Sequence, residues 1–382
     1  MKTKFVLLIV SIILSLFIAE LALQAAHGNH FFIRTPHSHY LLKPESQYLP
    51  GIEGEARFIV NSLGLRGDEL QNQEIRILSI GGSTSEGAYL DQAETWQYLL
   101  QNMLEQKTGK RVWIGNAGMP RRASPNHVLQ LEKLLNQISD IDLVIVLMGF
   151  NDMGLSSKKS YNPRGFDDPV FIEECLRDSF EVTPLRPRRI RDLELYKRLF
   201  EFFDLITKSG TYKLEGYARN GAWHEQKRLQ RQRSAKITLS KEMETRFFIG
   251  LEDYKKNIER MINLSRKHHT KILFLTQPSL YKVNMPEEEE KLLMFGALPD
   301  QDPERPNVYV LASEIKRLLD LYNQSLLETA GKNGAWGFDL DKVISPASDS
   351  FYDDLHFNEA GAKRVAESVS QNICNARLLS CQ

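Results

Sequence analysis

The chain has 382 residues, of which 49 are Lys or Arg and 49 are Asp or Glu, and 42% of its residues are hydrophobic. This composition is typical of a globular protein and excludes collagen-like, disulfide-framework and fully disordered chains. Because the formal net charge is zero, the chain has no overall attraction to nucleic acid or anionic lipid, and any basic surface has to be local.

The first predicted element is an apolar segment near the N-terminus. Residues 5–19 contain no charged side chain, and Lys2 and Lys4 precede them while Glu20 follows. As a helix, residues 5–26 would rise about 33 Å, which is enough to cross a bilayer. No clean small-x-small cleavage site follows, so we expect an uncleaved signal anchor over residues 1–26, with a cleaved export signal as the alternative. The preceding lysines predict that the rest of the chain is extracytoplasmic, in the periplasm or outside the cell.

Five apolar runs rich in β-branched and aromatic residues predict a parallel sheet that is buried on both faces. They are residues 76–82, 112–117, 143–150, 271–277 and 335–340. Helix-like stretches separate the first three runs, and this alternation predicts an open α/β sandwich preceded by a lead-in arm over residues 27–75. Ligands of such folds bind beyond the carboxyl ends of the strands, so the residues that follow each run are the candidates for a site.

The third and fourth runs are about 120 residues apart, far more than one crossover helix requires. Apolar residues at helical spacing over residues 246–268 predict that crossover helix, which leaves residues 155–245 as a largely helical insertion. Within it, the basic amphipathic stretch at 186–206 fits either a helix on a membrane surface or a surface helix of its own domain. A second basic run, residues 227–236, is interpreted as a solvated face or a mobile segment.

The three cysteines give a weaker indication. Cys374 and Cys381 are close enough in sequence to form a small disulfide loop in an oxidising compartment, although their proximity could equally be chance. Cys175 has no His or Asp pattern around it that would indicate a nucleophile.

A serine follows the first predicted strand, within the sequence GGSTSEG at residues 81–87. The two glycines before Ser83 permit a tight turn that exposes its hydroxyl above the edge of the sheet. The segment does not match a phosphate-binding loop, because Ala88 and Tyr89 stand where Lys and Ser or Thr are required. It also lacks the spacing of a dinucleotide fingerprint and of a G-x-S-x-G nucleophile elbow.

Three later segments follow the other predicted strands and supply the remaining groups for acyl transfer. They are GNAGM at 115–119, GFNDMG at 149–154 and DDLHFNEAG at 353–361. A serine hydroxyl needs a base to attack an ester at neutral pH, and His356 is the candidate. The imidazole needs a carboxylate on its other nitrogen, for which Asp353 is preferred and Asp354 is the rival.

An oxyanion formed during acyl transfer needs hydrogen-bond donors. The backbone N–H groups of Ser83 and Gly118 and the side-chain amide of Asn151 are the candidates, and one such donor contributes roughly 3 to 4 kcal/mol.

The order of these blocks resembles that of the SGNH (GDSL-type) hydrolase superfamily, whose four blocks would here carry Ser83, Gly118, Asn151 and His356. The resemblance spans about residues 76–154 and 246–370, and NSLGLRG at 61–67 is similar to membrane-anchored members. It implies a flavodoxin-like three-layer α/β/α sandwich with about five parallel strands.

The resemblance also implies roles for the site residues. Ser83 would be the nucleophile, Asp353 and His356 would complete the triad, and Gly118 and Asn151 would join the Ser83 N–H in the oxyanion hole. Two positions depart from the usual pattern: Gly82 replaces an Asp, and Ser85 replaces a Thr. The hydrolase domain would comprise residues 76–154 and 246–382. The insertion at 155–245 has no counterpart in the minimal fold, and it could serve either as a lid or as a binding surface.

Together these features predict a membrane-anchored, extracytoplasmic serine esterase that acts through an acyl-enzyme on acyl groups of glycans or lipids. Two alternatives stay open: an O-acyltransferase acting on envelope polysaccharide, and a non-catalytic envelope protein that binds a glycan or a partner. We expect no cofactor and no nucleic-acid partner. We also expect no metal, because the histidine pairs at 37 and 39 and at 268 and 269 have no further ligands at suitable spacing. The acyl group, the acceptor and the oligomeric state are left open.

Overall fold

A five-stranded parallel sheet forms the centre of the computed structural model, which describes residues 11, 14–19, 30–158, 161, 165–183, 220–298, 301 and 307–382. Its strands are β3 (Ile75–Gly81), β4 (Val112–Asn116), β5 (Leu143–Leu147), β7 (Lys271–Leu275) and β9 (Trp336–Phe338). They lie in the order β4-β3-β5-β7-β9, with every neighbouring pair parallel. Numbered along the chain, this order is 2-1-3-4-5, that of a flavodoxin-like doubly wound sheet. The predicted α/β fold with five parallel strands is confirmed.

The strands end earlier than the apolar runs predicted. All five residues of β5 are buried, but the strand stops at Leu147 although the apolar run continues to Phe150. The reason is Gly149, whose φ of 133° lies outside the range of extended strands and turns the chain into the next helix. At β9 the run similarly continues to Leu340, which instead begins a short helix.

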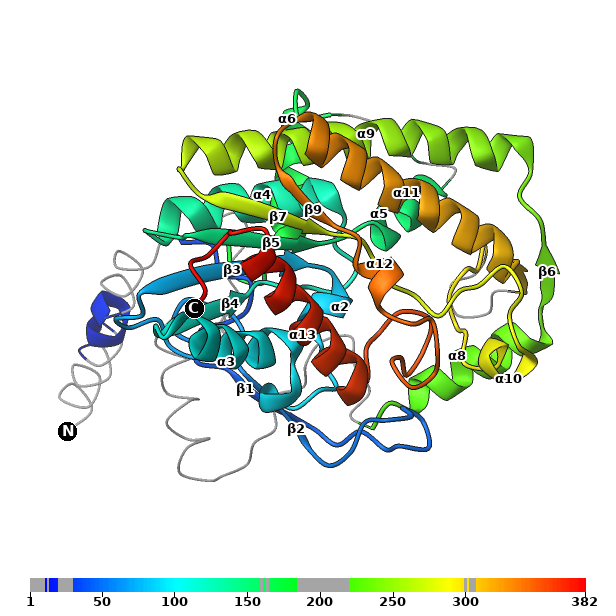
Figure 1. Cartoon of the computed structure of the whole chain (residues 1–382), viewed down its shortest axis with the longest axis horizontal. Coiled ribbons are helices and arrows are strands. Elements are labelled where there is room, and N and C mark those ends of the chain that lie inside the picture. Colours follow the sequence, from blue (N-terminus) through cyan, green and yellow to red (C-terminus); the bar gives the residue numbers. More distant parts are fainter. Residues whose placement is uncertain are drawn as a thin grey trace, which may run out of the picture.

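Helices cover both faces of the sheet (Figure 1). On one face lie α3 (Trp96–Thr108) and α13 (Glu359–Asn375), which contact each other. On the other lie α4 (Ser124–Gln137), α9 (Lys241–Lys267) and α11 (Ala312–Lys332), with α9 between the other two. The crossover helix expected at 246–268 is α9. It starts five residues earlier, where the Ser240 hydroxyl accepts a hydrogen bond from the Met243 N–H.

Shorter elements connect these layers. They are α2 (Ser83–Glu86), the 3-10 helix η1 (Gln92–Glu94), α5 (Phe150–Ser156), α10 (Glu287–Glu290) and α12 (Leu340–Val343). The lead-in arm contributes an antiparallel pair, β1 (His39–Leu42) and β2 (Ala56–Ile59).

The described parts of the insertion pack on the main domain. Helix α6 (Pro169–Ser179) contacts α4. After α8 (Ala222–Arg233), strand β6 (Ala235–Ile237) pairs with β8 (Val308–Val310). In the sequence, β6 precedes the crossover helix α9 and β8 follows it. The basic stretch at 186–206 lies outside the described residues.

The interpretation of residues 227–236 as a solvated or mobile segment is wrong for two of its arginines. Arg228 and Arg231 lie on α8 with exposed fractions of 7% and 1%. Their guanidinium groups donate hydrogen bonds to backbone carbonyls of the main domain and, at Tyr48, of the lead-in arm, which offsets the cost of burying the charge.

The N-terminal segment is described only at Ser11 and residues 14–19, which are helical. Within the part of the chain that the structure describes, no helix combines the length and apolar character required to span a bilayer. At the opposite end, Cys374 at the close of α13 forms a disulfide with Cys381, while Cys175 is a free thiol whose pKa burial raises to about 12.

Candidate active site

The serine loop lies at the carboxyl end of β3, where Gly81 ends the strand and Ser83 begins α2. Neighbouring atoms lie so close to Gly81 and Gly82 that neither position has room for a side chain. A Cβ on Gly81 would lie 2.7 Å from the Leu147 carbonyl oxygen, and one on Gly82 would lie 2.6 Å from the Asn151 amide nitrogen. The absence of side chains therefore lets the loop pack against β5 and Asn151 while Ser83 lies at the sheet edge.

A hydrogen-bonded chain joins Ser83 to the DDLH segment, 273 residues away in sequence. The His356 Nε2 atom is 2.7 Å from Ser83 Oγ, and His356 Nδ1 is 2.7 Å from Asp353 Oδ2 and 3.0 Å from Asp353 Oδ1. Asp353 also accepts hydrogen bonds from the backbone N–H groups of Leu355 and His356. The structure thus brings together the three residues expected for a triad, with the imidazole between the hydroxyl and the carboxylate.

The electrostatics of the pair favour a charged imidazolium. Burial is the largest single effect and would raise the pKa of Asp353, but the charge and hydrogen bond of His356, with His224 and the Leu355 N–H, together lower it to about 2. Burial is the largest single effect and would lower the pKa of His356, but the Asp353 carboxylate, with smaller contributions from Asp354 and Glu86, raises that pKa above its ordinary value. A histidine in this position accepts a proton from a hydroxyl more readily than a free imidazole does.

The rival carboxylate, Asp354, faces away from the imidazole. It accepts hydrogen bonds from the Tyr281 hydroxyl and from the backbone N–H groups of Met294 and Phe295, at 2.7 and 3.1 Å for the two backbone donors. Burial, together with the neighbouring Asp353 charge, raises the pKa of Asp354. Of the two carboxylates, only Asp353 contacts His356.

The expected oxyanion donors Asn151 and Gly118 differ in how far their N–H groups are already engaged in hydrogen bonds. Asn151 donates one amide hydrogen to the Arg122 carbonyl at 2.8 Å, and the same nitrogen packs against Gly82, next to Ser83. An amide nitrogen carries two hydrogens, so Asn151 has a second hydrogen to donate. Gly118 packs against the backbone of α2, but its N–H donates to the Asn116 side chain at 2.8 Å. To serve an oxyanion, Gly118 would have to share this hydrogen with Asn116.

Two arginines of the lead-in arm hold the end of α2, and sequence reasoning did not single them out. Buried Arg34 forms an ion pair with buried Glu86. Arg66 donates to the backbone carbonyls of Glu86 and Gly87 at 2.7 and 2.8 Å. Arg66 belongs to NSLGLRG, a segment noted in the sequence only for its similarity to membrane-anchored proteins, so its contact with α2 was not predicted.

Helix α8 of the insertion also reaches the triad. The Nε2 atom of buried His224 is 3.6 Å from Asp353 Oδ2, and burial lowers the pKa of His224 to about 4. Its ring packs edge-on against Tyr352, which stacks on the His356 ring with centroids 5.5 Å apart. One turn later, Arg228 donates to the carbonyls of Tyr352 and Tyr48. Helix α8 of the insertion therefore packs on the buried side of Asp353 and His356.

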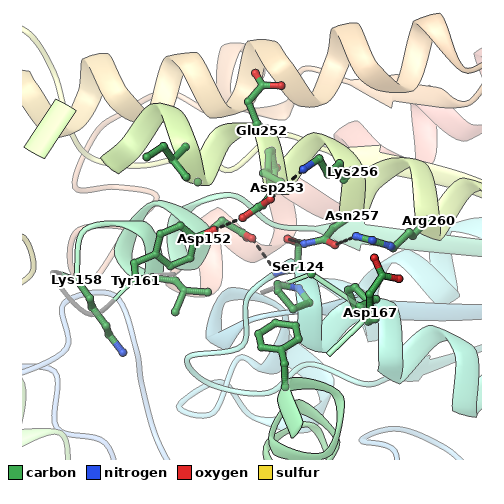
Figure 2. Close-up of a pocket in the computed structure, with 18 of the residues that line it drawn as sticks. Ser124, Asp152, Lys158, Tyr161, Asp167, Glu252, Asp253, Lys256, Asn257 and Arg260 are labelled. Carbon is green, nitrogen blue, oxygen red and sulfur yellow. Dashed lines mark hydrogen bonds and ion pairs between the residues drawn. The ribbon is translucent and has the colours of Figure 1, made fainter. Parts of the chain in front are cut away.

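A separate cavity of about 820 Å³ lies between α4, α5, α6 and α9, and neither Ser83 nor His356 lines it. Figure 2 shows Asp253 on α9 in contact with Tyr161 and Lys256. It also shows the Asp152 carboxylate accepting a hydrogen bond from the Ser124 N–H. Burial raises the pKa of Asp152 to about 7. In the described parts of the chain, no three His, Cys, Asp or Glu side chains cluster in a way that could hold a metal ion.

No family model and no curated protein matches this chain. Several solved structures show a distant similarity to this chain. The acetylxylan esterase Axe2 of Geobacillus stearothermophilus is 13% identical with a TM-score of 0.39, and the match covers 79% of this chain and 95% of that one. A carbohydrate acetylesterase family member from Sinorhizobium meliloti is 14% identical with a TM-score of 0.39, covering 78% and 97%.

A third similar structure is a candidate lipolytic protein of the G-D-S-L family from Desulfitobacterium hafniense. It is 10% identical with a TM-score of 0.38, and the match covers 78% of this chain and 99% of that one. Likeness of this degree does not decide activity, so the function has to be inferred from the side chains of this chain.

Proposed function

We propose that this protein is a serine hydrolase of the SGNH type that cleaves ester bonds through an acyl-enzyme. The observation that carries the proposal is the chain of contacts from Ser83 Oγ through His356 to Asp353, with 2.7 Å at each of its two closest contacts. A buried carboxylate, an imidazole and a hydroxyl in this order form the arrangement that activates a serine for acyl transfer.

The residues fit each step of such a reaction. Ser83 Oγ attacks the ester carbonyl carbon while its proton moves to His356 Nε2, and Asp353 stabilises the resulting imidazolium. The carbonyl oxygen becomes an oxyanion, for which the Asn151 amide, which packs against Gly82 of the serine loop, is a candidate donor. The carbon–oxygen bond to the alcohol then breaks, and His356 returns the proton to that alcohol. Water repeats the sequence and releases the acid and free Ser83.

The substrate class and location are further parts of the proposal. We expect acyl groups carried on glycans or lipids, and a membrane-anchored protein whose catalytic domain is extracytoplasmic. The apolar residues 5–19 behind Lys2 and Lys4 support the location. The disulfide between Cys374 and Cys381 is consistent with an oxidising compartment.

Covalent labelling tests the proposal before any natural substrate is known. The purified 382-residue chain should react with a fluorophosphonate probe and hydrolyse p-nitrophenyl acetate. Ser83→Ala should lose both while keeping its thermal transition, and Ser157→Ala, which removes an exposed hydroxyl that donates to the Gly154 carbonyl, should keep both. Equal labelling of wild type and Ser83→Ala would refute the nucleophile assignment, and no labelling of wild type would favour a non-catalytic binding protein.

A further inference from the structure

Helix α8 of the insertion places a second histidine beside the carboxylate of the triad. The His224 Nε2 atom lies 3.6 Å from Asp353 Oδ2, the same oxygen that His356 Nδ1 contacts at 2.7 Å. A separation of 3.6 Å is longer than a hydrogen bond but short enough for a strong electrostatic contact. Asp353 is 0% exposed and His224 is 3% exposed, so bulk water does not screen this contact.

The Asp353 carboxylate can accept one more donor. The backbone N–H groups of Leu355 and His356 and the His356 Nδ1 hydrogen are three donors to it. An ionised carboxylate offers about four acceptor positions. Because a buried charge is stabilised by each N–H that faces it, a hydrogen on His224 Nε2 would stabilise the ionised form of Asp353.

His224 has a single ring hydrogen to place at neutral pH. Burial lowers its pKa to about 4, and its place in the first turn of α8 also disfavours a cation. Its Nδ1 atom is 3.1 Å from the Gly221 carbonyl oxygen, which already accepts the His224 backbone N–H at 2.9 Å. A charged acceptor stabilises an N–H group more than a neutral carbonyl does, so the hydrogen belongs on Nε2, which faces Asp353.

Helix α8 is held where it presents His224 to the triad. It begins at Gly221, whose φ of 84° is a left-handed conformation that glycine adopts without strain. One turn after His224, Arg228 donates to the carbonyl of Tyr352, the residue that precedes the carboxylate. The His224 ring also packs edge-on against Tyr89 and Tyr352, with centroids 5.3 and 5.6 Å away. The ring therefore has little freedom to turn away.

Several other charged or titratable groups lie around Asp353 and its two histidines. They are Glu86 of α2, Tyr89, Arg228 of α8, Tyr281, Tyr352 and Asp354. Burial raises the pKa of the three tyrosines, which therefore stay neutral. Since the carboxylates also act on His356, the role of His224 has to be read from variants that differ only at that position.

We propose that His224 is a positioning residue for the base of the triad, which presents its Nε2 hydrogen to Asp353 and so shares that carboxylate with His356. This rests on the proposed esterase function. A carboxylate that also faces the His224 N–H attracts a proton on His356 less strongly. His356 then stays unprotonated to lower pH, and the unprotonated form is the one that accepts the hydrogen of Ser83.

Substitutions of His224 test this through the acid limb of kcat/KM for p-nitrophenyl acetate, the fall in rate as the base becomes protonated. His224→Phe keeps an aromatic ring but removes the N–H, so the limb should move up by about 0.5 to 1 pH unit, which makes kcat/KM about three- to tenfold lower on that limb. His224→Gln can place its amide nitrogen at the Nε2 position and should keep the wild-type limb. His224→Asn reaches only the Nδ1 position and should move the limb as His224→Phe does.

Two controls separate this role from packing and from a direct effect on the base. His39→Phe, the same change at an exposed histidine on β1, should leave the limb unchanged. In an Asp353→Asn background, His224→Phe should cause no further shift in the pH dependence of fluorophosphonate labelling, because the carboxylate through which His224 acts is gone. A further shift there would overturn the assignment.

The remaining outcomes are equally decisive. A wild-type limb in His224→Phe, or a limb in His224→Gln that moves as far as in His224→Asn, overturns the role of His224 and leaves the esterase intact. If His224→Phe loses its thermal transition, the comparison of the Gln and Asn variants decides alone. A wild-type protein that neither hydrolyses the ester nor reacts with the fluorophosphonate probe instead overturns the esterase itself.

Discussion

Replacing Asp353 by Asn tests the electrostatic logic of the site with the smallest change in shape. The carboxylate accepts the His356 Nδ1 hydrogen and two backbone N–H groups. An amide keeps the volume but removes the charge and can present N–H groups to the imidazole instead of oxygen. The histidine is then held in the wrong tautomer and its cation loses its partner.

The expected loss follows from the burial of the pair. Asp353 is 0% exposed and His356 is 8% exposed, so water replaces little of the missing interaction. Breaking a buried charge pair costs about 3 to 5 kcal/mol, and each 1.36 kcal/mol of barrier is a factor of ten. We therefore expect kcat/KM for p-nitrophenyl acetate to fall roughly 10²- to 10⁴-fold.

The pH profile gives a second and independent readout. Because Asp353 raises the pKa of His356, the acid limb of kcat/KM should move to lower pH in Asp353→Asn, as the neutral base persists further into acid. The exposed, Arg364-paired Asp349 provides the matched control, and Asp349→Asn should change neither rate nor profile. A rate within tenfold of wild type, or an acid limb that does not move, would contradict the role assigned to Asp353.

The remaining predictions concern the oxyanion donor, the buried acid and the insertion. Asn151→Ala should lower kcat about 10²- to 10³-fold with little change in KM, and an unchanged kcat would exclude it as a donor. Because burial raises the pKa of Asp152 to about 7, the folded state retains a proton that the unfolded chain releases above about pH 4, so stability falls as pH rises between these values. Asp152→Asn should therefore raise the urea midpoint more at pH 8 than at pH 5, and a pH-independent effect would contradict this origin. Arg228→Met should lower the free energy of unfolding by about 3 kcal/mol, because buried carbonyls lose a charged donor, whereas the same change at exposed Arg233 on α8 should cost under about 0.5 kcal/mol.

Local pattern determined the strands and the order of the candidate groups. A parallel strand buried on both faces is recognisable as a continuous apolar run, and the carboxyl ends of such strands meet at one edge of the sheet. Ser83, Asn151 and His356 could therefore be expected near one another from the segments that carry them. The turn of four residues from Asp353 to His356 is also short enough to be anticipated.

Tertiary structure decided the contributions that come from distant segments. No local pattern distinguishes Arg228 and Arg231 from solvated arginines, because their partners are backbone carbonyls, which every residue carries. Whether Asp353 or Asp354 faces His356 likewise depends on the loop at Met294 and Phe295, which occupies one of the two carboxylates.

The serine, the base and their neighbouring strands were thus determined by short-range sequence, since a strand end and a tight turn need only a few residues to form. The burial of the α8 arginines and the choice of their carbonyl partners were decided only by packing. Hydrogen-bond partners and desolvation depend on which segments meet in space, and segments far apart in the chain, such as those of Arg228 and Tyr48, leave no mark of that meeting in their own composition.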